Sequence, residues 1–297
     1  MVFDPNGRPI GSLLIAQPFT KDDYFQPRPS AASYDASASS SSALAASNYA
    51  LRNRVANSLG SIVKYRNGAK AGQLVAPDME SWFQHDQFEG SPHIVAQWAT
   101  LHNSLAQAWV NADPSHGAYV DSWTKTHPSQ VSQFIKDNPG TPNPKAADLA
   151  IVFFQNFSKE LPGQFPSRVT HVATYGKTET TIEPVNTGSD IQSIFFDMWR
   201  QEHPAVELED VPADMVTTSG SGLDPHITLQ NALYQLDRVS TKWARNLKRN
   251  PKDVKNEIEQ ILNGKASAPF GGLAGEKVVN VLDVNLVLRK QYGSPQS

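Results

Sequence analysis

The chain has 297 residues with a formal net charge of −3, and 39% of its residues are hydrophobic. This length suits one large domain or two ordinary ones, and the slight negative charge excludes the basic surface that wholesale nucleic-acid binding needs. The absence of cysteine excludes disulfides, thiolate catalysis and cysteine-bound zinc. No apolar run approaches the roughly 20 residues that span a bilayer, and no secretory signal pattern opens the chain. We therefore expect the chain as given to be soluble.

The first third predicts a strand, a long loop and a helix. The apolar run IGSLLIA at 10–16 predicts a buried strand. The segment 24–46 is rich in serine and proline, and its aromatic residues indicate a loop pinned to the fold rather than a disordered linker. From 48 to 64, apolar residues recur at helical spacing, which predicts a helix.

The middle of the chain, about 65–204, differs in composition from its flanks. It holds five of the six tryptophans and seven of the eight histidines, which predicts a separate core. A repeat with a 25-residue offset aligns the segment from Trp98 with the segment from Trp123, so that His102 matches His127. Two copies are too few for a solenoid, and we expect two similar helical hairpins packed through their tryptophans.

Further elements are predicted within the same middle segment. Residues 148–159 have the apolar pattern of a buried helix. Alternating threonines over 168–183, interrupted at Gly176-Lys177, predict a β-hairpin. Ser189, with Gln192 three residues later, predicts a capping box at the start of a helix.

The last third again mixes short strands with helices. Residues 211–216 predict a strand, Thr228 and Asn250 are each expected to cap a helix, and 277–290 predict a strand passing into a short helix. The whole pattern predicts the α+β class. We expect a small mixed sheet with helices, built from 1–64 and 205–297, interrupted by a mostly helical insertion over 65–204.

The stretch SGSGLDPH at 219–226 raises the question of serine catalysis. A nucleophile elbow needs glycine two residues before and two after the serine, but Ser219 and Leu223 occupy these positions around Ser221. A Ser-x-x-Lys pair begins at Ser61 without the Lys-Thr-Gly partner that accompanies it in serine enzymes. The glycines instead favour a tight connection between a strand and a helix.

Metal and phosphate chemistry find equally little support. His85, His93, His102, His116 and His127 could converge on zinc, but no pair has the His-x-x-x-His spacing. The repeat instead favours structural positions, each one helical turn after a tryptophan, so we predict no metal site. No glycine-rich phosphate motif is present.

One basic run contrasts with the slightly negative net charge of the chain. Lysines and arginines recur between 242 and 255, with acidic residues soon after them. This pattern favours a solvated helix face, and a partner or an anionic membrane surface is the alternative.

Three sequence blocks resemble, in order, the C subunit of the potassium-transporting Kdp ATPase, the KdpC family. They are GSLLIAQPFTKDDYFQPRPSAASYDASASSSS with ALAASNYAL, then VPADMVTTSGSGLDPHITLQNALYQLDRVS, then GGLAGEKVVNVLDVNLVL. The resemblance covers about 7–64 and 205–292. It leaves the segment 65–204 as an insertion that typical members lack.

The resemblance implies a non-catalytic accessory subunit of a P-type ATPase complex for high-affinity potassium uptake. Its partners would be the channel-like A subunit and the ATP-hydrolysing B subunit. Family members carry an N-terminal membrane helix that anchors this domain on the extracytoplasmic, periplasmic face. That helix is missing here, so we expect an excised domain or a naturally soluble homologue.

The resemblance also implies how such a subunit acts. It would stabilise assembly of the complex and, in one proposal, serve as a catalytic chaperone that raises the nucleotide affinity of the B subunit. ATP would then be reached through the B subunit, and we expect no cofactor bound directly to this chain.

The family motifs, carried over residue by residue, fall on two loops and the helix that follows the second loop. We expect the matching residues to be core and interface determinants rather than catalysts. They are Gln17, Pro18, Phe19, Tyr24, Phe25, Arg28, Pro29, Ser30, Ser219, Gly220, Ser221, Gly222, Leu223, Asp224, Pro225, His226, Gln235, Arg238 and Val239.

Two other functions remain open on the sequence alone. One is a serine hydrolase that uses Ser221 or Ser61. The other is an isolated nucleotide-binding regulatory module that uses the glycine-serine loop.

Overall fold

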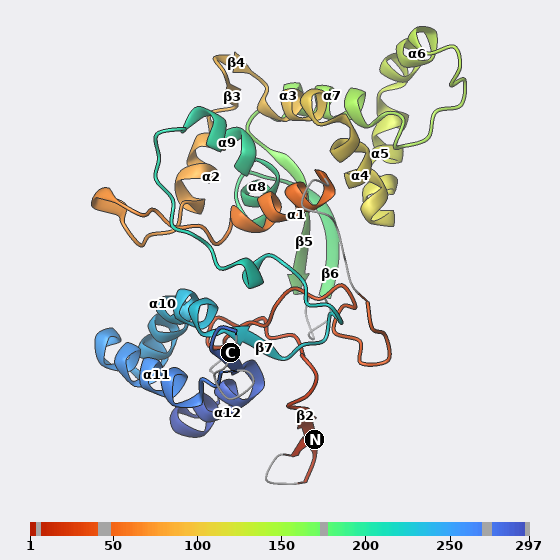
Figure 1. Cartoon of the computed structure of the whole chain (residues 1–297). Coiled ribbons are helices and arrows are strands. Elements are labelled where there is room, and N and C mark those ends of the chain that lie inside the picture. Colours follow the sequence, from red (N-terminus) through yellow and green to blue (C-terminus); the bar gives the residue numbers. More distant parts are fainter. Residues whose placement is uncertain (4–6, 41–48, 173–177, 269–274, 295–297) are drawn as a thin grey trace. The chain divides into compact units, whose positions relative to one another are not determined.

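The computed structural model describes residues 1–3, 7–40, 49–172, 178–268 and 275–294. The chain divides into two compact units, and Figure 1 labels most of their helices and several of their strands. Unit 1 contains Met1–Val55 and Asp210–Ser297, and unit 2 contains Ala56–Glu209. The two ends of the chain therefore fold together, while unit 2 is formed by one continuous middle stretch.

Unit 1 is built from three long helices and several short elements. A two-stranded antiparallel ribbon of β7 (His226–Thr228) and β8 (Val278–Asn280) leads into α10 (Leu229–Leu247) and α12 (Val281–Tyr292). Helix α1 (Tyr49–Leu59) begins in unit 1 and ends in unit 2. The other described elements are β1 (Val2–Phe3), β2 (Pro9–Gly11), the 3₁₀ helix η3 (Ala213–Met215) and α11 (Pro251–Lys265).

Each long helix of unit 1 begins at a residue that caps it. Thr228 accepts a hydrogen bond from the backbone N–H of Asn231, and Asn250 accepts one from Lys252, so the two predicted caps are confirmed. Asn280 caps α12 in the same way. The apolar faces of the three helices then pack into one core, which contains Phe25, Ile227, Ala232, Leu236, Val239, Trp243, Val254, Ile258, Leu262, Val279, Val281, Val284 and Leu288.

Unit 2 is mainly helical and carries one longer hairpin. Its strands β5 and β6 pair antiparallel, with Phe165 opposite Val185, and the predicted turn at 176–177 lies outside the described residues. The described elements are η1 (Gly68–Lys70), α2 (Ala76–Gln84), β3 (Gln87–Phe88), β4 (Ser91–Pro92), α3 (Ile94–Leu101), α4 (Asn103–Ala112), α5 (Pro114–Thr126), α6 (Pro128–Asp137), α7 (Ala150–Glu160), β5 (Phe165–Val172), β6 (Thr178–Val185), α8 (Ser189–Ile194) and α9 (Phe196–Glu202).

The core of unit 2 is dominated by aromatic rings. The Trp98 ring meets Phe154 and Phe165 edge-on, with centroids 5.1 and 5.5 Å apart, and Phe165 packs edge-on against Phe195. Such geometry places the positive edge of one ring on the negative face of another. The tryptophans therefore hold helices and hairpin together from inside.

Histidines end three helices of unit 2 in the same conformation. His102, His127 and His203 have φ between −120° and −126° and ψ between 49° and 52°, each four residues after a tryptophan. The rings of His127 and His203 stack on those tryptophans at 4.7 Å. These histidines are structural, and no group of three or more potential metal ligands occurs among the described residues.

Two predicted strands are wrong. Residues 10–16 were expected to form a buried strand, but β2 ends at Gly11 and the chain turns from Ser12 to Ile15, which leaves Leu14 83% exposed. Residues 211–216 contain the 3₁₀ helix η3 instead of a strand. The first run pairs with β1 only at its start, through β2, and the Ile15 N–H then bonds back to the Ser12 carbonyl. In the second run, the N–H groups of Met215 and Val216 bond to the carbonyls of Pro212 and Ala213, so the backbone is paired within a local turn.

Two finer predictions also need correction. Gly188, not Ser189, precedes α8, and the carboxylate of Glu80 in α2 accepts hydrogen bonds from the Gly188 N–H and the Gln192 side chain. The Glu80 side chain therefore takes the hydrogen bonds at the start of α8 that the predicted capping box would have made. The α+β class is confirmed, but the ribbon of unit 1 has two antiparallel strands, smaller than the expected mixed sheet.

Candidate functional site

The first family motif, over 17–30, runs without helix or strand along unit 1. Its backbone at Phe25 is clamped by Asn285 of α12, because the side chain of Asn285 accepts from the Phe25 N–H and donates to the Phe25 carbonyl, both at 2.9 Å. Phe25 and Asn285 are buried. A side-chain amide thus supplies the pairing that a neighbouring strand would give an extended segment.

Helix α10 holds the same segment through two further side chains. Gln235 accepts from the Gln26 N–H at 2.8 Å and donates to the Gln26 carbonyl at 3.1 Å. Arg238 donates to the carbonyls of Asp22 and Tyr24. Burial lowers the pKa of the Arg238 guanidinium, and the nearby Asp22 carboxylate opposes that effect.

The second family motif closes onto the first through Gly222. This glycine has φ of +71°, and a Cβ there would lie 2.7 Å from the carbonyl oxygen of Ser40 and 3.2 Å from the nitrogen of Ala32. The Ser30 hydroxyl donates to the Gly222 carbonyl at 2.5 Å. Glycine is required both for the backbone angle and for the close approach of the two loops.

Arg28 ties the segment before this turn to the first motif. Its guanidinium donates to the carbonyls of Thr217 and Thr218, at 3.4 and 2.9 Å. The Tyr34 hydroxyl in turn donates to the Arg28 carbonyl, and burial raises the pKa of Tyr34. Arg28 therefore binds backbone within unit 1, a role that could not be assigned from its position in the sequence.

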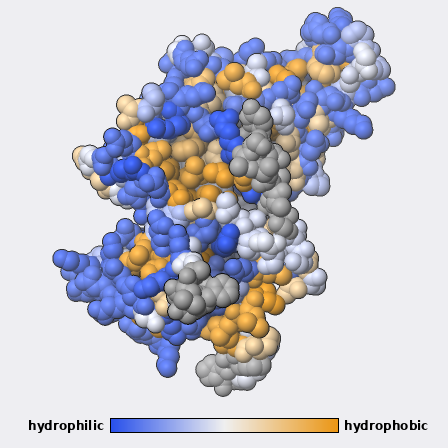
Figure 2. Space-filling view, viewed as in Figure 1, coloured by the Kyte–Doolittle hydropathy of each residue, from blue (hydrophilic) through white to orange (hydrophobic). Residues whose placement is uncertain are grey.

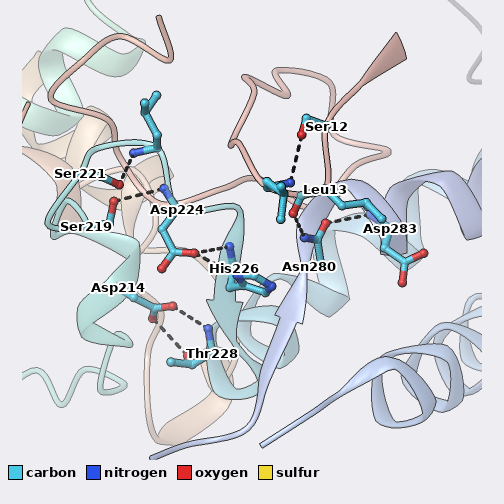
Figure 3. Close-up of polar contacts among 12 residues, drawn as sticks. Ser12, Leu13, Asp214, Ser219, Ser221, Asp224, His226, Thr228, Asn280 and Asp283 are labelled. Atoms are coloured by element: carbon cyan, nitrogen blue, oxygen red, sulfur yellow. Dashed lines mark hydrogen bonds and ion pairs between the residues drawn. The ribbon is translucent and has the colours of Figure 1, made fainter. Parts of the chain in front are cut away.

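Acidic side chains fix the entry to α10, as Figure 3 shows. Asp214 accepts from both the N–H and the hydroxyl of Thr228, so the helix cap is itself held in place. Asp224 accepts from the N–H of His226 and lies 3.0 Å from its Nδ1. The Asp-Pro-His stretch is a turn stabilised by its own carboxylate.

An apolar turn stands beside these loops and was missed by the sequence analysis. Leu13 and Leu14 are 42% and 83% exposed, and hydrophobic side chains gather beside β2 in Figure 2. Asn280 donates to the Leu13 carbonyl at 2.8 Å, and the Ala16 N–H donates to the Leu223 carbonyl (Figure 3 shows the contact with Asn280). The C-terminal segment of unit 1 thus holds the turn on both sides.

The remaining motif residues divide into inward and outward groups. Pro225 is buried like Phe25, and Phe19 meets Tyr24 edge-on at 5.4 Å. Pro29 and Leu223 are half-buried, as is Gln17, which donates to the Ile10 carbonyl. The exposed members are Pro18, Gly220 and Ser221.

Serine catalysis finds no support in this geometry. The Ser221 hydroxyl accepts a hydrogen bond from the Leu223 N–H, and Ser61 donates to the carbonyl of Ser58. No described contact joins either hydroxyl to a histidine or lysine base. A serine nucleophile needs such a base within hydrogen-bond reach.

Both motifs lie in parts of the chain that match a known protein family. The family model described as "K+-transporting ATPase, c chain" matches residues 1–81 and 184–290, which is more than half of the chain. The chain belongs to the KdpC family. The resemblance seen in the sequence is therefore confirmed, and residues 82–183 lie outside the matched parts.

Curated relatives carry the same family name. The potassium-transporting ATPase KdpC subunit of Clostridium botulinum (strain Alaska E43 / Type E3) is 44% identical over 92 residues, 31% of this chain and 42% of the relative. That of Bacillus cereus (strain AH820) is 32% identical over 139 residues, 46% of this chain and 67% of the relative. The chain thus spans less than half the length of the first relative.

The family description names one chain of a potassium-transporting ATPase. None of the described helices combines the length and hydropathy that a bilayer crossing requires.

Proposed function

We propose that this chain is a non-catalytic accessory subunit that stabilises the assembly of a high-affinity, ATP-driven potassium uptake complex. Its partners in this proposal are the channel-like A subunit and the ATP-hydrolysing B subunit, and unit 1 lies on the extracytoplasmic, periplasmic face. Membership of the KdpC family supports the complex. The fixed, exposed turn at Leu13 and Leu14 supports a docking role for unit 1.

The observation that carries the docking role is the combination of apolar exposure with rigid support. Leu14 is 83% exposed, yet its neighbours are bonded to Asn280 and to Leu223, one on each side of the turn. A preformed apolar projection loses little conformational entropy on binding, so it suits a contact with a partner subunit. The exposed residues Gly220 and Ser221 lie on the loop whose Leu223 carbonyl bonds to Ala16, and in this proposal they extend the contact.

The inward motif residues have a different part in this proposal. They hold the two loops against each other or against α10 and α12, so they shape the contact surface without forming it. These residues are Phe25, Arg28, Ser30, Gly222, Gln235 and Arg238. Substituting them would alter assembly through the fold of unit 1. Surface substitutions are therefore the sharper test of docking.

The test uses co-expression of the full chain with the A and B subunits, with an affinity tag on the A subunit. We expect Leu14→Glu to reduce the amount of chain retained by about tenfold or more, because it places a charge in an apolar contact. Leu233→Glu is the matched control, since Leu233 is a 38% exposed leucine on α10. Equal retention of a folded Leu14→Glu variant would contradict docking through this turn.

A role in nucleotide affinity is the second part of the proposal. We assign any such effect to contact with the B subunit, because the N–H of Gly222 donates to the Ser219 carbonyl and is not free to bind phosphate. The expected result is an ATPase activity with a lower KM for ATP when the chain is present. Calorimetric heat on mixing ATP and magnesium with the chain alone would contradict this assignment.

A further inference from the structure

Basic side chains gather where α10 turns into α11, in unit 1. Between 242 and 255 the chain carries six basic residues and one acidic residue, while the chain as a whole has a net charge of −3. Figure 1 shows α10 and α11 side by side, and the surface over them in Figure 2 is mostly hydrophilic. The positive charge is therefore local, on a chain that is negative elsewhere.

Two of the six basic residues are neutralised by ion pairs. Arg249 binds the Glu257 carboxylate, and Lys255 of α11 binds Asp237 of α10. Among the residues that the structure describes, the side chains of the other four form no ion pair and no hydrogen bond. We call these four the basic corner: Lys242, Arg245, Lys248 and Lys252, of which the first is half-buried and the others are exposed.

The acidic groups near the basic corner do not neutralise it. Asp22 and Asp23 are engaged with residues of α10 outside the corner. Asp253 lies in the first turn of α11, where the helix dipole stabilises a carboxylate. Glu259 lies about two helical turns further along α11 than the corner. The corner therefore keeps a net positive charge.

The helix dipole explains only part of the basic corner. Arg245 and Lys248 lie at the C-terminal end of α10, where the dipole favours cations. Lys252 is the second residue of α11, where the dipole disfavours a cation. The charge of Lys252 is thus unfavourable for the helix that carries it, which points to a role other than stability.

The backbone under the basic corner is fixed. Lys248 has a φ of +53°, the Arg249 N–H donates to the Ala244 carbonyl at 2.9 Å, and Asn250 caps α11. Lysine side chains extend from such a backbone as flexible point charges. They suit an array of mobile anionic headgroups better than a single ligand held in one geometry.

We propose that the basic corner contacts the surface of a bilayer that contains anionic phospholipids. The proposal rests on the proposed function in one respect, since a subunit of a potassium-transporting ATPase lies beside a membrane. Each lysine or arginine near an anionic bilayer strengthens binding by about fivefold. Four such residues orient unit 1 on the membrane, and salt screens the contact.

The test mixes the full chain, without the A and B subunits, with vesicles of phosphatidylcholine alone or mixed equally with phosphatidylglycerol. Flotation separates bound from free chain. We expect binding to the mixed vesicles at low salt, and at least about tenfold weaker binding to phosphatidylcholine or at about 0.15 M salt. Because the chain has a net charge of −3, its overall charge opposes this binding. The A and B subunits are absent, so the outcome is separate from that of the co-expression test.

Lys252→Glu separates membrane binding from folding. It replaces a cation by an anion at the N-terminus of α11, so it should raise the thermal midpoint while weakening vesicle binding by about fivefold or more. Lys248→Glu combined with Lys252→Glu should weaken binding by at least about tenfold.

The matched control combines Lys125→Glu with Lys136→Glu. Both lysines are exposed in unit 2, and the control changes the net charge of the chain by the same amount. It should weaken vesicle binding by less than about twofold, because salt screens charges that lie away from the contact.

Three results would overturn the proposal. The first is that the wild-type chain does not bind the mixed vesicles at low salt. The second is that the double variant of the basic corner and the control weaken binding equally. The third is that Lys252→Glu lowers retention by the A subunit but leaves vesicle binding unchanged, which would assign the basic corner to a protein partner.

Discussion

The two units of this chain satisfy their buried polar groups in different ways. In unit 1, side chains from helices reach far along the sequence to pair with backbone, as Asn285 does with Phe25 and Gln235 with Gln26. In unit 2, rings pack on rings, and the Nε1 atoms of Trp98, Trp109 and Trp123 stay unpaired among the described residues. Unit 1 is held by specific polar contacts, whereas unit 2 is held by aromatic packing.

This difference coincides with the family match. The matched residues 1–81 and 184–290 include all of the clamps on the 17–30 segment, while the tryptophans of the repeat lie in the unmatched 82–183. The contrast shows where single substitutions should be most costly. A substitution in unit 1 leaves buried backbone groups without hydrogen-bond partners and lowers the free energy of unfolding. A substitution in unit 2 can instead remove an unpaired polar atom and raise that free energy.

The largest expected effect is at Asn285. Asn285→Ala leaves the buried N–H and carbonyl of Phe25 unpaired, and should lower the free energy of unfolding of unit 1 by about 2–5 kcal/mol. Denaturant unfolding followed by circular dichroism measures this. Asn256→Ala, at an exposed position of α11, should change it by less than about 0.5 kcal/mol. Similar losses in the two variants would show that the clamp is unimportant.

Gly222 should come next. Gly222→Ala brings a Cβ against backbone atoms at a φ of +71°, and should destabilise unit 1 by about 1–3 kcal/mol. Gly220→Ala is its control, because nothing lies within 4 Å of a Cβ there. Thermal midpoints of both variants test the pair, and an unaffected Gly222→Ala would mean that the loops can move apart without loss.

A pair of serines tests the contrast most directly, because opposite signs are expected. Ser30 donates to the Gly222 carbonyl and accepts from Ala32 and Tyr34, so Ser30→Ala should cost about 1–3 kcal/mol. Ser158 is fully buried and unpaired in the described structure, so Ser158→Ala should be neutral or stabilising by up to about 1 kcal/mol. Urea unfolding of both variants gives the two signs, and a loss in both would remove the distinction between the units.

The smallest expected effect concerns acid pH. Hydrogen bonds from Arg249 and then from Tyr292 lower the pKa of Glu257. The folded-state pKa therefore lies below the unfolded one, so the stabilisation is present above about pH 4.5 and is lost as the pH falls through the folded-state pKa.

Glu257→Gln should therefore flatten the pH dependence of unfolding below about pH 4.5. Glu259→Gln, at a residue with no ion pair in the described part of the chain, should leave the dependence as it is. Denaturant unfolding at a series of pH values distinguishes them, and an unchanged slope in Glu257→Gln would contradict the assignment.

The helices of unit 1 could be predicted because their signals are local. Thr228 and Asn250 lie directly before apolar residues at helical spacing, and a side chain of this type caps a helix whatever surrounds it. The turn at Leu13 and Leu14 could not be predicted, because an apolar run does not reveal whether a partner strand exists. Contacts with Asn280 and Leu223, each more than 200 residues away in the sequence, hold its conformation.

The motif residues show the same limit. The resemblance identified Arg28, Ser30 and Gly222, but their bonds join parts of the chain about 190 residues apart, so the sequence could not show that they face inward. Glu80 likewise replaces the predicted capping box from more than 100 residues away. The third Trp-x-x-x-His pair, at Trp199 and His203, was present in the sequence and could have been found by extending the repeat.

Amide hydrogen exchange of the full chain, alone and within the co-expressed complex, tests most directly whether unit 1 makes the subunit contact. We predict slower exchange in the complex over 11–17 and 219–224, with exchange over 82–183 unchanged. Protection confined to 82–183 would contradict the account, because it would place the contact in unit 2.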